Sequence, residues 1–455
     1  MAITIHQQPD LHSAISTPLI VTATSTNSNN DGFKFVVQVD TGLNLSLNDM
    51  YISANNNGYL VYDVAPMMRP YMRNLNYIES TLGLNGGSIH NLYNPNFLNI
   101  NEQYAGTQIP HAGCTIIDVS IKEGWNVDGV FTINNPSEVN FNIVVYNFQD
   151  FGIRNGYKPD LLATIGHNEG DQSRLMSDRL PTTYDWPAAR FVGISQPNAI
   201  YIPVREADYG QWGVRTAISE GTGSTASKVR LSILPNSGPP VQEVYSLDPI
   251  TLWAHLPLYP ANLNESTLPD ILKPSDYPNW KAIYFQILNE SDEQVSMNYV
   301  MFNVDHPQYG ECSCHGYEIV RLAWVGRRGG WEYQNFTLLS ETEYETEQKT
   351  AKRVVGNYGN VQSSTDFYFN PIDESEFVTY KKINKFVTCN TDILQPGEWE
   401  FLKGLILSKQ VHWVHDDGTH TPVIIQDSNF KVRNPKSKAR EALTVRFKVA
   451  QDQSN

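Results

Sequence analysis

The sequence is poor in cysteine, with only Cys114, Cys312, Cys314 and Cys389 among 455 residues. These are too few and too unevenly spaced for a disulfide framework, so we interpret them as reduced thiols in a protein made in a cytoplasm. Long apolar runs are also missing, since none approaches the roughly 18 residues that a membrane helix needs. The N-terminus shows no basic region followed by an apolar one. We therefore expect neither a secretory signal nor a membrane segment.

Basic residues are outnumbered, because 33 Lys and Arg stand against 48 Asp and Glu and give a formal net charge of -15. Binding to phosphate backbones needs clustered cations, so this balance argues against nucleic acid as a partner.

Catalytic motifs are missing too, including Gly-x-Ser-x-Gly, His-Glu-x-x-His, the Walker loop and Gly-x-Gly-x-x-Gly. The alternating Glu341, Glu343, Glu345 and Glu347 predict one solvated side of a strand rather than a catalytic carboxylate pair. We expect a protein that is not an enzyme and needs no cofactor.

Aromatic residues make up 11% of the chain, with 24 tyrosines, and this composition favours β structure. The predicted fold class is mainly β, with several domains of β-sandwich or jelly-roll-like units and one clear C-terminal helix. Length alone suggests two to four domains. A Pro-Pro pair at 239–240 marks an extended linker. The predicted division is an N-terminal β-sandwich-like domain at 1–103, an inserted β domain at 104–234, a linker at 235–247 and a C-terminal β domain at 248–455.

Two N-terminal segments, 18–24 and 33–40, are predicted to be strands of one hairpin. Alternation places Phe33, Phe35, Val37 and Val39 on one face of the second strand. A short helix is predicted at 65–73, because Asp63 is a suitable cap and Pro66 suits a first helical turn.

The stretch 317–344 is expected to organise the C-terminal half. It predicts two apolar strands joined by a turn at 325–330, which carries Arg327 and Arg328 between glycines. A helix is predicted at 397–408 from an apolar stripe at helical spacing. Strands at 411–414 and 421–426 are expected to flank a turn that contains Asp417-Gly418.

Two clusters contain metal-ligating residue types. His306, Cys312, Cys314 and His315 are weak candidates for a structural zinc site, but the spacing favours a loop with reduced thiols. His412, His415, Asp416, Asp417 and His420 form the second cluster, in which His415 and His420 flank the turn and are placed to face each other. A polar exposed turn explains that cluster better than a cation site does.

Aromatic residues in the middle block supply a candidate platform for a glycan, namely Tyr184, Trp186, Tyr209 and Trp212. The competing interpretation places them in β-domain cores. A basic tail stands out near the C-terminus, formed by Lys431, Arg433, Lys436, Lys438 and Arg440. We expect it to dock on an acidic neighbouring copy rather than on nucleic acid.

Several segments, in this order, carry a resemblance to a known family. The N-terminal ones are PLIVTATSTN at 18–27, FKFVVQVD at 33–40 and NGYLVYDV at 57–64. The C-terminal ones are CHGYEIVRLAWVGRRGGWEYQNFTL at 314–338, TCNTDILQPGEWEFLKGLILSKQVHW at 388–413 and PVIIQDSNF at 422–430. The layout resembles virion structural proteins, of tail type, of bacteriophages that infect Bacteroidota, the group that includes crAss-like phages.

The resemblance implies a tail or tail-hub component, located in the virion tail after synthesis in the host cytoplasm. It would form a homo-oligomeric ring and contact other tail or connector proteins. The alternative is a tail adaptor or fibre-anchor module that binds a host receptor or surface glycan. Aromatic and Arg side chains dominate such contacts. The interface candidates are Trp324, Arg327, Arg328, Trp331 and Tyr333, with Arg433, Lys436, Lys438 and Arg440 of the basic tail.

Overall fold

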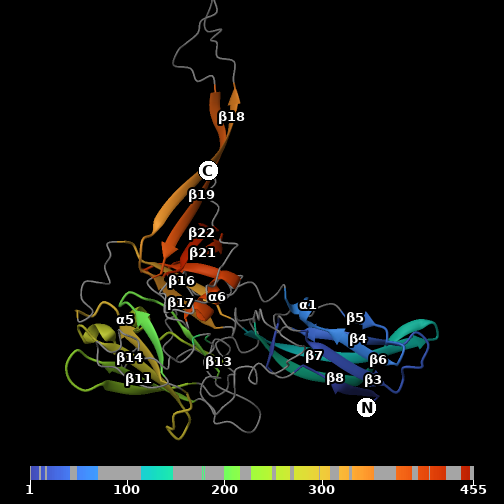
Figure 1. Ribbon diagram of the computed structural model, residues 1–455. Coiled ribbons are helices and arrows are strands. Elements are labelled where there is room, and N and C mark those ends of the chain that lie inside the picture. The colour runs from blue at the N-terminus through green and yellow to red at the C-terminus, as the bar shows by residue number, and fades with distance from the viewer. Residues whose placement is uncertain are drawn as a thin grey trace, which may run out of the picture.

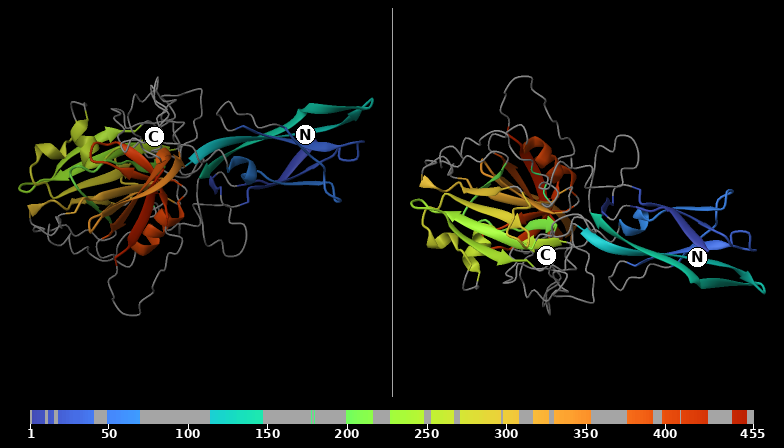
Figure 2. Two further views of the ribbon diagram at one scale, coloured as in Figure 1. Left: turned by 90° about the horizontal axis from the view of Figure 1, so that it is seen from above. Right: turned by 90° about the horizontal axis from the view of Figure 1, so that it is seen from below.

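A computed structural model of the chain is mainly β, as predicted (Figure 1). It describes residues 2–9, 12–15, 18–40, 49–69, 114–146, 177, 179, 199–215, 227–247, 253–266, 271–296, 298–307, 317–326, 330–352, 376–391, 398–408, 410–426 and 442–450. The figures show an N-terminal unit to one side and the remaining sheets gathered together beside it (Figure 2).

The N-terminal unit contains two sheets. One has the strand order β1-β3-β6, and the other has the order β2-β8-β7-β4-β5. The strands are β1 (Ile3–Gln7), β2 (His12–Ala14), β3 (Ile20–Ser25), β4 (Lys34–Asp40), β5 (Met50–Ile52), β6 (Tyr59–Asp63), β7 (Cys114–Val127) and β8 (Val130–Tyr146).

Both sheets contribute to one buried cluster, which is the arrangement of a β-sandwich. Phe33, Phe35, Val37 and Val39 all lie in this cluster, so the predicted alternation is confirmed. The predicted hairpin is wrong, however. β3 pairs with β1 and β6, whereas β4 pairs with β5 and β7. The two strands belong to opposite layers, because packing apolar faces together buries more surface than pairing neighbours in sequence.

The predicted domain boundary between 103 and 104 is also wrong. β4 precedes that boundary and β7 follows it, yet Lys34–Asp40 pairs with residues 118–124 of β7 along its whole length. The strands of the supposed inserted domain therefore complete the N-terminal sandwich.

A long hairpin is formed by β7 and β8, which reverse at Asp128 and Gly129 with φ angles of 52° and 80°. Val127 pairs with Val130 across this two-residue turn. Positive φ at both turn residues matches the twist of a tight hairpin, and Asp-Gly is a favoured pair there. The helix predicted nearby is α1 (Ala65–Met68), whose first N–H donates to the Asp63 carboxylate at 3.0 Å. Its remaining predicted residues, from 70 to 73, lie outside the described residues.

A five-stranded sheet in the order β12-β11-β14-β15-β9 forms the next part of the chain. Its strands are β9 (Ile200–Val204), β11 (Lys228–Leu234), β12 (Val241–Ser246), β14 (Ala282–Leu288) and β15 (Tyr299–Asn303). A separate pair joins β10 (Trp212–Arg215) to β13 (Trp253–Leu256), and the helix α5 (Pro260–Glu265) and the 3-10 turn η3 (Pro274–Asp276) follow it.

The predicted linker at 235–247 is wrong, because most of it is β12 and the turn that precedes it. β12 pairs with β11 along its length, and β11 in turn pairs with β14. The Pro-Pro pair thus belongs to a hairpin loop, in which Gly238 adopts a φ of 98°. Proline favours such loops as well as extended spacers, and sequence alone does not separate the two.

The C-terminal part is a seven-stranded sheet in the order β17-β16-β20-β21-β22-β19-β18. Its strands are β16 (Val320–Val325), β17 (Trp331–Phe336), β18 (Glu341–Lys352), β19 (Glu376–Asn390), β20 (Val411–Val414), β21 (His420–Ile425) and β22 (Thr444–Val449). The predicted helix is confirmed as α6 (Glu398–Leu407), whose Phe401, Leu402 and Leu405 pack on one face of this sheet. The predicted hairpins β16–β17 and β20–β21 are confirmed as well.

The two sheets of the N-terminal sandwich are connected by one buried carboxyl group. Glu123 of β7 is fully buried and accepts hydrogen bonds from Ser25 Oγ, at the end of β3, and from the side-chain amides of Asn27 and Asn134 at 2.8 and 3.2 Å. Replacing Glu123 by alanine leaves three donors without their acceptor, and such a loss costs more when the site is buried.

We expect Glu123→Ala to lower the free energy of local opening by about 3 kcal/mol, measured by hydrogen–deuterium exchange of β7 and β3. Glu138→Ala is the matched control, because Glu138 accepts the same kind of bond from Ser120 Oγ at 2.7 Å on an exposed part of the same hairpin. That control should change the opening free energy by less than about 0.5 kcal/mol. Equal effects of the two variants would show that Glu123 does not connect the sheets.

Candidate functional site

The hairpin β16–β17 lies at one end of the seven-stranded sheet, and every residue of both strands is buried. Gly326 N–H donates to the Gly330 carbonyl at 2.8 Å and closes its turn. The hairpin contributes to two cores at once. Trp324 packs against Phe401 of α6, while Trp331 and Tyr333 point the other way, into the core shared with the five-stranded sheet.

These aromatic residues were predicted to make contacts with other subunits, and that prediction is wrong for this chain. Trp324, Trp331 and Tyr333 are at most 3% exposed, so they hold the chain's own sheets together. The physical reason is that large aromatic side chains bury the most apolar area, so placing them in the interior stabilises the fold most. Arg327 and Arg328 lie outside the described residues, as do Arg433, Lys436, Lys438 and Arg440.

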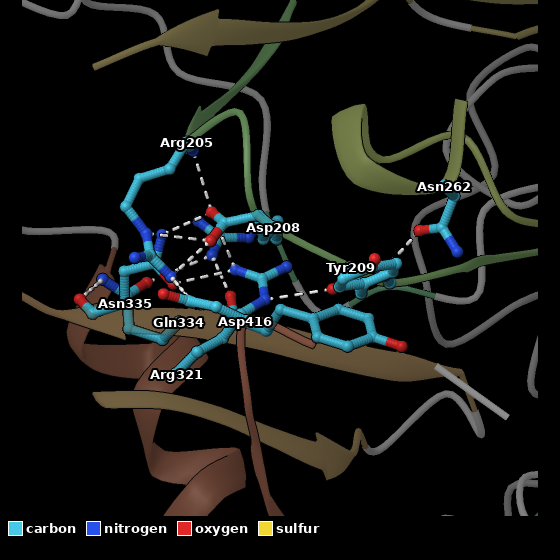
Figure 3. Close-up of polar contacts among 11 residues, drawn as sticks. Arg205, Asp208, Tyr209, Asn262, Arg321, Gln334, Asn335 and Asp416 are labelled. Carbon is cyan, nitrogen blue, oxygen red and sulfur yellow. Dashed lines mark hydrogen bonds and ion pairs between the residues drawn. The ribbon is translucent and has the colours of Figure 1, made fainter. Parts of the chain in front are cut away.

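A buried polar network fixes this hairpin to the loop that follows β9 (Figure 3). Asp208 is its centre and is fully buried. One carboxylate oxygen accepts from Arg205 Nε at 3.0 Å and lies 2.8 Å from Arg205 Nη2. The other accepts from Arg205 N, from Arg321 Nη1 and from Asn335 Nδ2, at 2.9, 3.2 and 2.6 Å. Protein donors thus surround both oxygens of Asp208.

Arg321 of β16 is the second charged residue of the network. Its Nε donates to the Tyr209 carbonyl at 3.0 Å, and its Nη1 donates to Asn335 Oδ1 at 2.9 Å. The guanidinium also lies 4.8 Å from the ring centres of both Tyr259 and Tyr333. A cation held over aromatic faces, with a carboxylate beside it, is stabilised despite burial. Nε and Nη1 of Arg321 have acceptors, whereas the buried Nη2 has no hydrogen-bond partner among the described residues.

The two tyrosines under Arg321 are shielded from water. Burial raises the pKa of Tyr259 to about 12, and burial likewise raises the pKa of Tyr333 well above its ordinary value. Tyr333 keeps its hydroxyl hydrogen-bonded by accepting from Gln211 N–H at 3.1 Å. Gly210 allows this packing, because a Cβ there would lie 2.9 Å from the Tyr259 ring and 3.0 Å from that of Tyr333.

Arg179 enters the same region from a distant part of the chain. Its Nη2 donates to the Tyr333 carbonyl at 2.8 Å and to Gln334 Oε1 at 3.2 Å, and its guanidinium lies 3.9 Å from the Phe401 ring centre. Ser177 Oγ donates to the Glu332 carboxylate at 3.0 Å. Burial lowers the pKa of Arg179. Ser177 and Arg179 thus connect their part of the chain to β17 and α6.

The network suits a structural role better than a chemical one. Its charged groups are paired with, or hydrogen-bonded to, other residues of the chain, and its tyrosines are kept protonated at neutral pH. Its one exposed member is Asp416, which is 64% exposed and pairs with Arg205 Nη2 at 2.9 Å. That pair connects the β20–β21 turn to the loop after β9.

The second predicted metal cluster is dispersed among other contacts. His412 and His420 stack with ring centres 4.6 Å apart, and His412 also contacts Trp331. His415 interacts instead with Thr421 Oγ1 at 2.9 Å, so the prediction that it faces His420 is wrong. Within the described ranges, no group of three His, Cys, Asp or Glu side chains could hold a metal ion.

Other predicted site residues are only partly testable. His306 is buried and its Nε2 lies 3.3 Å from Asn236 Oδ1, while Cys312, Cys314 and His315 lie outside the described residues. Tyr209 and Trp212 are 3% and 2% exposed, which contradicts a glycan platform at these two positions. Tyr184 and Trp186 lie outside the described residues. Among the helices that are described, none is long and apolar enough to cross a membrane.

The exposed feature of the C-terminal sheet is the hairpin β18–β19, which we call the arm. It extends away from the body as a two-stranded ribbon (Figure 1). Residues 341–350 and 376–381 are all exposed, including Tyr344, Phe377, Val378 and Tyr380, which are 38–60% exposed. The prediction that the alternating glutamates lie on a solvated strand is confirmed.

Sequence reasoning did not single out Asp208, Arg205 or Arg321. The available signal was weak. Arg321 is the one charged residue of an otherwise apolar strand, and Glu332 is the one charged residue of its partner strand. Charged residues in such strands are almost always paired when buried. No protein-family model matches the sequence, and a search among characterised proteins finds no match either.

The first prediction from this site concerns Asp208. Asp208→Ala leaves Arg205 and Arg321 buried without their shared carboxylate, so we expect a loss of about 4 kcal/mol in the free energy of unfolding measured with urea. Asp416→Ala removes the exposed partner of the same Arg205 and should cost less than about 1 kcal/mol. Similar losses in both variants would contradict a buried centre at Asp208.

The second prediction concerns the stacked histidines. Burial lowers the pKa of His412 to about 3, and burial with the neighbouring His415 lowers the pKa of His420 to about 4. The unfolded chain takes up protons near pH 6.5, before the folded chain does. Stability is therefore complete above about pH 6.5 and falls as the pH drops toward 4, by at most about 1.4 kcal/mol per pH unit for each histidine.

His412→Phe should flatten this decline between pH 6.5 and 4.5, because the ring stack remains while one titrating group is lost. The measurement is the urea midpoint at a series of pH values. The control is His6→Phe, since His6 is exposed on the N-terminal sandwich. An unchanged slope in His412→Phe would disprove the assignment.

Proposed function

We propose that this chain is a non-enzymatic structural protein of a bacteriophage virion, a tail or tail-hub component present in several copies. It forms a ring with copies of itself and contacts other tail proteins. The host group is the Bacteroidota, as the resemblance of the segments at 18–64 and 314–430 implies. The protein is synthesised in the host cytoplasm and functions in the virion tail.

The observation that supports this proposal most is the arm. An isolated two-stranded hairpin is marginally stable in water, because it has no core of its own. Nine of the twelve residue pairs of this arm, from Tyr344↔Lys385 to Lys352↔Glu376, nevertheless extend beyond β22, with exposed aromatic side chains. A surface of this kind is typical of a segment that another subunit covers.

The rigid attachment of the arm supports an assembly role as well. β19 continues from the arm into the sheet, where it pairs with β22 over Phe386–Asn390. Val387 and Cys389 of the same strand are buried in the core beneath α6. A force or a contact at the arm is therefore transmitted directly to the body of the protein, which suits a structural component of a particle.

The test has two parts. Quantitative mass spectrometry of purified phage particles should find the chain in several copies per particle, and electron microscopy with a specific antibody should place it on the tail. Absence from purified particles would overturn the proposal. Mass photometry of the isolated protein should show multimers, because a ring needs contacts between copies.

Shortening the arm provides a direct prediction. Replacing residues 345–384 by Asn-Gly joins Tyr344 to its partner Lys385 through a two-residue turn. We expect the body to stay folded, with stability unchanged within about 1 kcal/mol, since residues 345–350 and 376–381 of the removed strands are exposed. Assembly measured by mass photometry should weaken by at least about tenfold.

The matched control is Val127→Ser combined with Val130→Ser, which alters another exposed hairpin tip, that of β7–β8. That variant should assemble like the original protein. If the shortened arm leaves assembly intact, the arm is not the contact surface.

A further inference from the structure

The two faces of the arm differ in charge. Partners in an antiparallel pair point to the same side, so the register assigns each side chain to a face. One face, the glutamate face, carries the charged residues Glu341, Glu343, Glu345, Glu347, Lys349 and Lys382. The opposite face, the lysine face, carries the charged residues Lys352, Glu376, Lys381 and Lys385.

The uncharged residues also differ between the faces. The lysine face has Thr342, Tyr344, Thr346, Gln348 and Thr350 along β18, opposite Val378 and Ile383. The glutamate face has the aromatic residues Phe377, Tyr380 and Phe386 along β19. Each face thus offers apolar contact area together with one predominant sign of charge.

Among the described residues, one ion pair joins a glutamate of the glutamate face to a cation, near the body of the protein. Farther out, Glu347 lies across the strands from Lys382 on the same face. Glu343 pairs with Arg446 of β22 at 2.8 Å, and the Arg446 guanidinium lies 4.8 Å from the Phe386 ring centre. Glu345 and Glu347 lie farther out and are exposed. On the other face, Lys385 lies 5.0 Å from the Trp413 ring centre at the base, while Lys381 and Lys352 are exposed beyond it.

We propose that the arm binds the arm of a second copy of this chain, with the glutamate face of one copy packed against the lysine face of the next. This inference rests on the proposed function, because it names the surface through which the copies meet. The occupant follows from charge complementarity. Each face repels the same face of an identical arm and attracts the opposite face.

The geometry of this contact is head-to-tail. Two different surfaces of the same chain meet, so each copy uses one face toward each neighbour, and such a contact generates a ring when the rotation closes. Pairing between strand edges is less favourable, because charged side chains on an outermost strand discourage it. β18 is the outermost strand of its sheet and carries the four glutamates.

Charge reversal tests this arrangement on the full chain. The variant in which acids are replaced, Glu345→Lys with Glu347→Lys, is called the acid variant, and it makes both faces basic. The variant in which bases are replaced, Lys352→Glu with Lys381→Glu, is called the base variant, and it makes both faces acidic. We expect each variant alone to assemble at least about tenfold more weakly than the original chain in mass photometry at low salt.

Two combinations of these substitutions distinguish a contact between arms from an effect of charge on folding. An equimolar mixture of the acid and base variants should assemble again, with the two chains alternating. A chain that carries all four substitutions has its two faces exchanged and should recover assembly by itself. Assembly of the original chain should weaken as ionic strength rises from about 0.05 to 1 M, because salt screens exposed charges.

The control is Glu243→Lys with Glu290→Lys, which changes the net charge as the acid variant does, at exposed positions in β12 and in the turn after β14. It should assemble like the original chain. If the acid and base variants assemble normally, or if mixing and the fourfold exchange restore nothing, the arm-to-arm contact is wrong. Assembly that requires a different virion protein at the arm would overturn it too.

The experiments test the arm contact and the proposed function separately. A chain that is found in phage tails and forms multimers insensitive to these substitutions keeps the proposed function and loses only the arm contact. A chain absent from purified particles loses the proposed function, whatever the substitutions do.

Discussion

The fully buried carboxylate of Asp208 is the interaction on which the C-terminal architecture depends. It joins Arg205, from the loop after β9, to Arg321 and Asn335 on the hairpin β16–β17. Two sheets and the turn that carries Asp416 are thereby held in one arrangement. Burying two arginines is costly unless their charges are matched, and Asp208 supplies the matching charge for both. The aromatic cores on either side, around Trp331 and around Trp324, depend on the same hairpin.

The arrangement of charges on the arm differs from that in the buried network. Inside the protein, acids and bases from different strands are brought together and shielded from water. On the described part of the arm, four of the five acids lie on one face and three of the five bases lie on the other, and most of them are in contact with solvent. Water makes such a separation inexpensive for the isolated chain, because exposed charges interact weakly at high dielectric. When a second surface displaces the water, the attraction between opposite charges becomes stronger. This attraction is the physical basis of the proposed assembly.

Local signals predicted the elements well and their partners poorly. Alternation at Phe33, Phe35, Val37 and Val39, the helical stripe of α6, and the Asp-Gly turn at 417–418 all lie where their chemistry indicates. The assignment of β3 and β4 to one hairpin, of 235–247 to a linker, and of Trp324, Trp331 and Tyr333 to a subunit interface failed. Each of these depends on which distant strand covers a given face, and a strand's own pattern does not contain that information.

The sequence by itself determined the class of the protein: mainly β, with one C-terminal helix and an alternating row of glutamates exposed on a strand. These follow from side-chain periodicity, which acts over a few residues. Only the tertiary structure decided that residues 114–146 complete the N-terminal sandwich, that Asp208 meets Arg321 across 113 positions, and that the arm carries opposite charges on its two faces. Those outcomes come from long-range pairing and register, in which a shift of one residue turns every side chain to the other face.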